Sequence, residues 1–134
     1  APATGGYEVL APDIGGIDNL AFDSQDRLFV SHSPGAISEV LADGTTRTVV
    51  AGGLIAPGGL AVENKRVLVA DWPLLREYDG TTGRELAVHQ VPGGTTVSAH
   101  NGRLILSNMM WTSGRQGLFD PLVQVWGPGE RRKS

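Results

Sequence analysis

Short apolar runs recur along the chain at intervals of about 40 residues, and none is sustained at the 3.6-residue period of a helix. In each repeat, an apolar run is followed by a tight polar turn and a second apolar run, which is the pattern of a β-hairpin. The three copies cover 19–31, 59–70 and 96–107, with Leu20, Leu60 and Val97 in corresponding places and Arg27, Arg66 and Arg103 opening the second run. The pattern therefore predicts repeated hairpins and almost no helix.

Further strands are predicted downstream of each hairpin. A third strand is expected at 37–41, 75–78 and 123–126, and a fourth at 46–50 and 84–91. Four short antiparallel strands in about 40 residues is typical of a β-propeller blade. We therefore predict an all-β fold of three blades within one half-propeller domain, covering 15–53, 54–93 and 94–127 and followed by a polar tail at 128–134.

Two repeats carry a family resemblance. Ile17-Asp-Asn-Leu-Ala-Phe-Asp with Arg27-Leu-Phe-Val-Ser, and Pro57-Gly-Gly-Leu-Ala-Val with Val67-Leu-Val-Ala-Asp, resemble the NHL-repeat and senescence-marker-protein/gluconolactonase-like six-bladed propellers. The resemblance implies a blade and not an activity. Members of this family usually have about twice as many blades in one chain, and the lactonase branch binds a divalent metal near the channel through Glu, Asn and Asp side chains. The Glu ligand has no clear match here.

Three blades cannot close a ring, because propellers have four to eight blades. Residues 6–11 are predicted to form a strand with no unit of their own in front of it. This closing strand can serve as the fourth strand of the third blade, which lacks one. We therefore expect a homodimer in which two half-rings exchange these strands. The alternatives are that the chain is a piece of a longer protein, or that the fold is a solenoid or β-sandwich, which the repeat disfavours.

Candidate site residues gather at one end of the predicted blades, where the first strand begins and the second ends. The candidates are His32, Trp72 and Trp111 for ligand binding, and Asp18, Asn19, Asp71 and Asn108 for a metal. Carboxylate and amide oxygens suit Ca²⁺ or another divalent cation, an aromatic ring can stack on a sugar, and a histidine can act as a base or ligand. The competing interpretations are turn capping by Asp71 and Asn108, which we favour, exposure of His32 in a loop, and packing of the tryptophans between blades.

Composition narrows the functional classes. Eleven basic and fourteen acidic residues give a net charge of −3, which does not favour nucleic acid or an anionic membrane as a partner. The absence of cysteine excludes disulfides and thiolate sites, and no apolar run approaches the roughly 20 residues of a membrane span. The compartment is left open, and export is compatible with the sequence.

The sequence supports a binding or scaffold module whose small-molecule site lies at the channel mouth of an assembled ring. One alternative is a divalent-metal-dependent, lactonase-like hydrolase. The other is a unit without activity until the ring closes. No Gly-x-Ser-x-Gly motif for a nucleophilic serine is present.

Overall fold

The computed structural model describes residues 5–12, 14–91, 95–107 and 123–127. These residues form eleven strands and no helix. Blade one contains β1 (Ile17–Phe22), β2 (Leu28–His32), β3 (Ala36–Val40) and β4 (Thr46–Val50); blade two contains β5 (Pro57–Glu63), β6 (Arg66–Asp71), β7 (Leu74–Asp79) and β8 (Glu85–Gln90); blade three contains β9 (Thr96–His100), β10 (Arg103–Ser107) and β11 (Val123–Trp126). The predicted all-β fold is confirmed, with small shifts in the strand boundaries.

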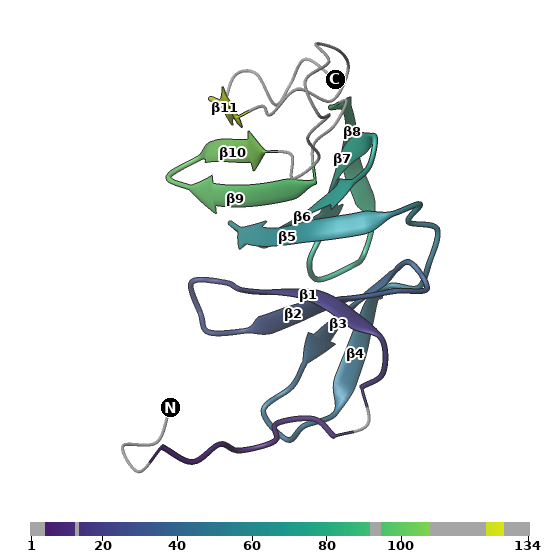
Figure 1. Cartoon of the computed structure of the whole chain (residues 1–134), viewed down its shortest axis with the longest axis vertical. Coiled ribbons are helices and arrows are strands. Elements are labelled where there is room, and N and C mark those ends of the chain that lie inside the picture. Colours follow the sequence, from purple (N-terminus) through teal and green to yellow (C-terminus); the bar gives the residue numbers. More distant parts are fainter. Residues whose placement is uncertain (1–4, 13, 92–94, 108–122, 128–134) are drawn as a thin grey trace, which may run out of the picture.

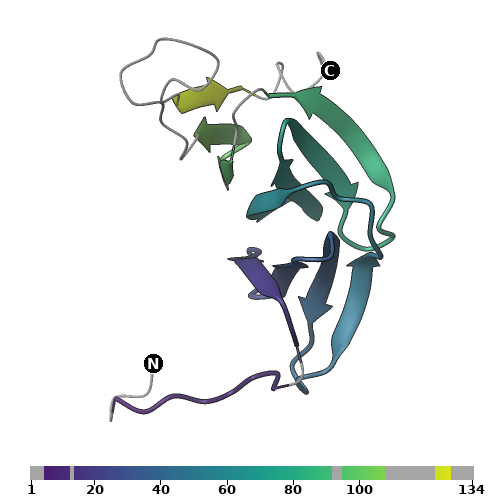
Figure 2. The ribbon, with the colours of Figure 1, turned by 45° about the vertical axis from the view of Figure 1, so that its right-hand side comes forward.

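Each blade is an antiparallel sheet whose strands follow one another in chain order. The first strands, β1, β5 and β9, lie next to one another along the inner side of the molecule, as Figure 1 shows. The sheets fan outward from these strands in the order of the chain (Figure 2). This arrangement is a partial β-propeller, and it places β1, β5 and β9 along the wall of the channel.

The hairpin turns explain why the first two strands of each blade pair so closely. Asn64 and Lys65 both have positive φ, 50° and 63°, as a two-residue turn that matches the strand twist requires. Asn101 and Gly102, at 49° and 76°, form the corresponding turn of blade three. In blade one the turn is longer, and a carboxylate oxygen of Asp23 accepts hydrogen bonds from the backbone amides of Gln25 and Arg27 at 2.8 and 2.9 Å.

The apolar cores lie between the blades. One core joins blades one and two, and the other joins blades two and three. The first contains Phe29, Ile37, Val49, Val50, Leu54, Leu60, Val67, Val69 and Tyr78, and the second contains Ala61, Leu68, Ala70, Leu75, Val91, Val97, Leu104 and Leu106. Blade two is covered on both faces, which explains why β6 is apolar and buried from Val67 to Ala70.

The predicted closing strand at 6–11 is not paired with a strand of this chain. Residues 5–12 form no strand, and Tyr7 is 90% exposed. The segment leaves blade one and extends away from it (Figures 1 and 2). In blade three, three strands are described, so a fourth strand from within this chain would have to come from outside the described residues.

Candidate functional site

One end of the blades gathers the sequence-predicted site residues. In the strand ladders, Ile17 is opposite His32, Pro57 is opposite Asp71, and Thr96 is opposite Ser107. The start of each channel strand therefore lies beside the end of the second strand of its blade. We call this end the channel mouth. The predicted shared face for the candidates of blades one and two is thus present.

Asp71 lies at the channel mouth and is completely buried. One carboxylate oxygen, Oδ1, accepts hydrogen bonds from the backbone amides of Ile55 and Ala56, both at 2.7 Å. The other, Oδ2, accepts a hydrogen bond from Nε of Arg76 at 2.7 Å. Asp71 therefore attaches the segment that enters blade two to the third strand of that blade, which agrees with the favoured capping interpretation.

His32 occupies the equivalent repeat position in blade one. One ring nitrogen, Nδ1, lies 3.2 Å from the carbonyl oxygen of Gly15, and Nε2 lies 3.0 Å from Oγ of Ser38. Like Asp71, His32 thus contacts the segment that enters its own blade and the third strand of that blade. The two side chains share one structural task, and the half-buried His32 is not a free loop residue.

The ion pair of Asp71 continues to the molecular surface. Nη1 of Arg76 donates a hydrogen bond to the exposed Glu85 at 3.0 Å. Burial works to lower the pKa of Arg76, but the hydrogen bonds to Asp71 and Glu85 outweigh it and raise the pKa above the ordinary value. The guanidinium therefore stays charged and keeps the buried Asp71 paired.

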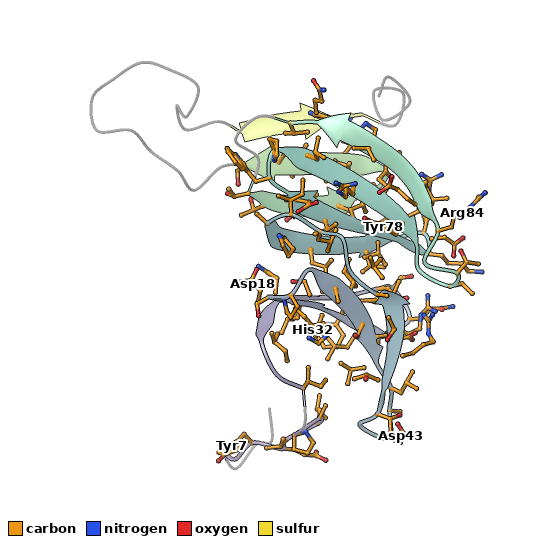
Figure 3. The ribbon with its side chains drawn as sticks, turned by 90° about the vertical axis from the view of Figure 1, so that its right-hand side faces the viewer. Tyr7, Asp18, His32, Asp43, Tyr78 and Arg84 are labelled. Atoms are coloured by element: carbon orange, nitrogen blue, oxygen red, sulfur yellow. The ribbon has the colours of Figure 1, made fainter. Side chains whose placement is uncertain are left out.

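Other residues at the channel mouth have exposed side chains. Asp18 and Asn19 are exposed at the start of β1, where Oγ of Ser31 accepts a hydrogen bond from the backbone amide of Asn19 at 3.1 Å. Asp18 and His32 are labelled in Figure 3. Trp72 is 37% exposed directly after Asp71, and Ile55, whose amide Asp71 holds, is exposed as well. The mouth therefore presents polar and apolar side chains on backbone that side-chain hydrogen bonds hold in place.

The predicted metal site stays a prediction. Among the described residues, no group of three or more histidine, aspartate or glutamate side chains is placed to hold an ion. Both oxygens of Asp71 are already used by donors. Asn108 and Trp111 lie outside the described residues.

Sequence analysis missed two buried carboxylates between the blades. Oε2 of Glu77 lies 2.7 Å from Nε2 of His89 inside the protein. The rings of His89 and Trp126 are nearly perpendicular, with 5.3 Å between their centroids. Glu39 occupies the repeat position of Glu77 and pairs with Arg47 at 2.5 Å. A glutamate at the same place in two third strands was the available signal.

Arg47 also ties two blades together. It donates hydrogen bonds to the carbonyl oxygens of Gly80 and Thr81, at 2.6 and 2.9 Å. These carbonyls lie at the turn of blade two between β7 and β8. The fourth strand of one blade thus packs on the third-to-fourth turn of the next.

Several solved structures are similar to this one in their backbone arrangement. Hydrazine synthase of Kuenenia stuttgartiensis superposes with a TM-score of 0.67 at 17% identity, over 95% of this chain and 36% of that one. Glutaminyl cyclase of Myxococcus xanthus superposes with a TM-score of 0.55 at 21% identity, over 69% of this chain and 41% of that one. The PQQ-bound aldose sugar dehydrogenase of Streptomyces coelicolor superposes with a TM-score of 0.51 at 16% identity, over 81% of this chain and 42% of that one.

These similarities show the fold alone. The chain is similar to less than half of each of the three proteins. No family model matches the sequence, and no curated protein matches it. Among the described residues, no helix of the length and hydropathy needed to cross a bilayer is present. The fold and the comparisons together define the chain as a β-propeller domain of three blades.

Proposed function

We propose that this domain is a ligand-binding module whose site lies at the channel mouth of a complete propeller ring. The observation that carries the proposal is the contrast at the mouth between fixed backbone and exposed side chains. The buried Asp71 and the half-buried His32 hold the entering segments through hydrogen bonds to backbone amides and a carbonyl. Asp18, Asn19 and Trp72 remain exposed beside them. Rigid backbone that presents a few polar and aromatic groups is typical of binding sites.

The site requires a ring, because three blades surround only part of a channel. Propellers close with four to eight blades. A second copy of this chain would bring the number to six. Such a ring would present two identical sets of mouth residues around one channel. The uncovered apolar side chains of the outer blades support this assembly, since large exposed apolar faces mark interaction surfaces.

The chemistry of the mouth favours a polar ligand with one apolar face. The Trp72 indole and the exposed Ile55 offer apolar contact, and Asp18 and Asn19 offer hydrogen-bonding groups. A sugar combines these properties, because its ring stacks on aromatic side chains while its hydroxyls bind carboxylates and amides. We therefore assign a monosaccharide or a sugar lactone as the ligand class.

A divalent-metal-dependent, lactonase-like hydrolase is the second candidate. Exposed oxygen donors at Asp18 and Asn19 support it, with Asn108 as a further ligand from the sequence pattern. The buried Asp71 does not fit a ligand set, because three donors already use its two oxygens. We therefore derive no hydrolytic step through a metal.

Isothermal titration calorimetry with D-glucose, glucono-1,5-lactone and CaCl₂ tests both candidates. We expect heat of binding with a sugar and its loss in Trp72→Ala. Ser24→Ala, an exposed substitution in the turn of blade one at the opposite end, is the matched control and should bind normally. No heat from either sugar with the assembled protein would contradict the binding proposal. Calcium-dependent lactone hydrolysis that Asp18→Ala abolishes would favour the hydrolase instead.

A further inference from the structure

Leu10, in the N-terminal segment (residues 5–12), lies against the turn between β3 and β4 of blade one, as Val49 of β4 lies against the turn between β7 and β8 of blade two. In blade two, Gly83 packs on the carbonyl oxygen of Val49 in β4 of blade one. In blade one, Gly44 packs in the same way on Leu10, and a Cβ on Gly44 would lie 2.5 Å from the Leu10 carbonyl oxygen. Each glycine has a positive φ, +84° for Gly44 and +74° for Gly83. Leu10 therefore contacts blade one in the same way that Val49 contacts blade two.

An open cavity of about 330 Å³ lies beside this segment. Its lining combines apolar side chains with polar and charged ones: Leu10, Phe22, Leu28, Val40, Leu41 and Ala42, and Gln25, Asp26, Arg27 and Glu39. The repeat equivalents of Phe22, Leu28 and Val40 are Val62, Val67 and Tyr78, which pack in the core between blades one and two. The cavity is therefore the place where a preceding blade would pack, and the N-terminal segment marks its outer edge.

Blade three has the complementary surface at the other end of the chain. Ile105 is 43% exposed and Val125 is 58% exposed. Ile105 occupies the repeat position of Phe29 and Leu68, both of which are fully buried against the following blade. Among the described strands, β11 pairs only with β10, whereas β3 and β7 each pair on both sides. Within the described residues, blade three thus has exposed apolar side chains on one face and an edge of β11 that no described strand pairs with.

We propose that residues 5–11 form the fourth strand of blade three of a second copy, and that the two copies exchange this strand reciprocally. The inference rests on the ring of the proposed function and names how it closes. The exposed face of blade three then covers the cavity on blade one of its partner. This contact repeats the blade contacts already present within the chain. Because it joins two different surfaces, it occurs twice around a twofold axis and closes at six blades.

The repeat also fixes the register of the exchanged strand. Arg47 lies opposite Glu39 in the ladder of blade one, and Thr46 lies opposite Val40. Glu39 corresponds to Val125 and Val40 to Trp126, because their partners in the second strands, Phe29 with Ile105 and Leu28 with Leu104, correspond. With Leu10 in the place of Val49, Glu8 takes the place of Arg47 and Tyr7 that of Thr46. Glu8 is therefore expected opposite Val125, and Tyr7 opposite Trp126.

A cysteine pair tests the exchange directly, because the chain contains no cysteine of its own. Directly opposed residues have Cα atoms about 4.5–5.5 Å apart, within the range of a disulfide. Mild oxidation of the Glu8→Cys/Val125→Cys variant should give a covalent dimer of about 28 kDa, twice the 14.1 kDa of one chain. The matched control is Asp43→Cys/Val125→Cys, which moves the first cysteine to an exposed turn and should stay uncoupled.

Light scattering of the unmodified chain provides the second measurement. The expected mass is that of a dimer. Val9→Pro should raise the dissociation constant about tenfold or more, because proline fixes φ at about −65°, far from the roughly −140° of an antiparallel strand. Val9 is exposed in the single chain, so this variant does not disturb either core. A folded monomer, or a disulfide formed within one chain, would overturn the exchange. A dimer that binds a sugar but does not form the 8–125 link would overturn the exchange and leave the proposed function standing.

Discussion

Blade two and blade one share one sequence pattern but differ in what covers them. Leu60 of blade two is 6% exposed, whereas Leu20, at the same repeat position in blade one, is 55% exposed. The same contrast holds between Val62, which packs against the first core, and the exposed Phe22. Among the described residues, no further blade covers these apolar residues of blade one.

The comparison teaches that burial in this fold is a property of the contact between blades. Blade two is the only described blade with a neighbour on each face, and it contributes to both cores. An isolated blade is a single sheet with apolar faces, which would not be stable alone. The stability of blades one and three should therefore depend on assembly, whereas that of blade two should not.

The largest expected effect is the loss of stability when Asp71 is replaced, compared with replacement of His32 at the equivalent repeat position. Asp71→Ala leaves two backbone amides and the Arg76 guanidinium without their buried acceptor, and should cost about 3–5 kcal/mol of unfolding free energy. His32→Ala removes two contacts from a half-buried site and should cost about 1 kcal/mol. Urea denaturation of both variants measures the difference. A loss of about 1 kcal/mol or less in Asp71→Ala would contradict the structural role assigned to Asp71.

Calcium retention after dialysis separates the structural role of Asp71 from metal ligation. We expect Asp71→Asn, which keeps the shape of the side chain, to retain as much Ca²⁺ as the unmodified protein. A drop in retention with unchanged folding would instead place Asp71 among metal ligands.

The second prediction concerns Leu20 and Leu60, which occupy the same repeat position in blades one and two. Leu60→Ala should lower the unfolding free energy by about 2–4 kcal/mol at any protein concentration, because its cavity lies within the chain. Leu20→Ala should cost less than about 0.5 kcal/mol in dilute solution and progressively more as the concentration rises. Denaturation at micromolar and at near-millimolar protein gives the two values. A cost for Leu20→Ala that does not change with concentration would argue against assembly through this face.

The repeat made most of the fold predictable. Corresponding residues such as Leu20 and Leu60, or Arg27 and Arg66, located the first two strands of each blade, because strands with buried faces need apolar residues at fixed positions. Third and fourth strands were placed within one or two residues. Their sequences vary more, since outer strands carry residues such as Arg47 and Glu85 that suit particular partners.

The candidate site was predictable in position but not in role. Asp71 and His32 stood out as polar residues after an apolar strand, and the structure does place them at the channel mouth. Their partners lie 15 to 17 residues earlier in the chain, at Ile55, Ala56 and Gly15. Nothing in a single sequence identifies a particular backbone amide or carbonyl as the partner. The Glu77–His89 pair was missed for the same reason, because it depends on how β7 and β8 align.

The third prediction uses the two glycines that pack on a neighbouring strand. Gly83→Ala introduces a Cβ against the Val49 carbonyl at positive φ, and should cost about 2–3 kcal/mol. Gly44→Ala meets Leu10, which lies in a segment that forms no strand, and should cost about 1–2 kcal/mol. Deleting residues 1–11 should reduce the cost of Gly44→Ala and leave that of Gly83→Ala unchanged. A double-mutant cycle measures this coupling. Zero coupling would contradict the position of the N-terminal segment.

The smallest expected effect is a pH dependence from the turn of blade one. Burial works to raise the pKa of Asp23, but hydrogen bonds from Arg27 and Gln25 outweigh it and hold the pKa below its ordinary value of 3.8. The folded state therefore binds this proton more weakly than the unfolded state does. The stabilisation is complete above the unfolded pKa and is lost as the pH falls through the lower folded value.

Asp23→Asn should flatten this part of the stability profile. At pH 6 the urea concentration at the midpoint of unfolding should be lower in the variant by roughly 0.2–0.5 M. This difference from the unmodified protein should shrink as the pH falls from about 4 to 2. Asp18→Asn, at the other end of β1, is the control for the loss of one negative charge. A difference that stays constant across this pH range would mean that the Asp23 turn adds no pH-dependent stability. Because the turn lies on the cavity-bearing end of blade one, the same titration at high protein concentration shows whether assembly covers it.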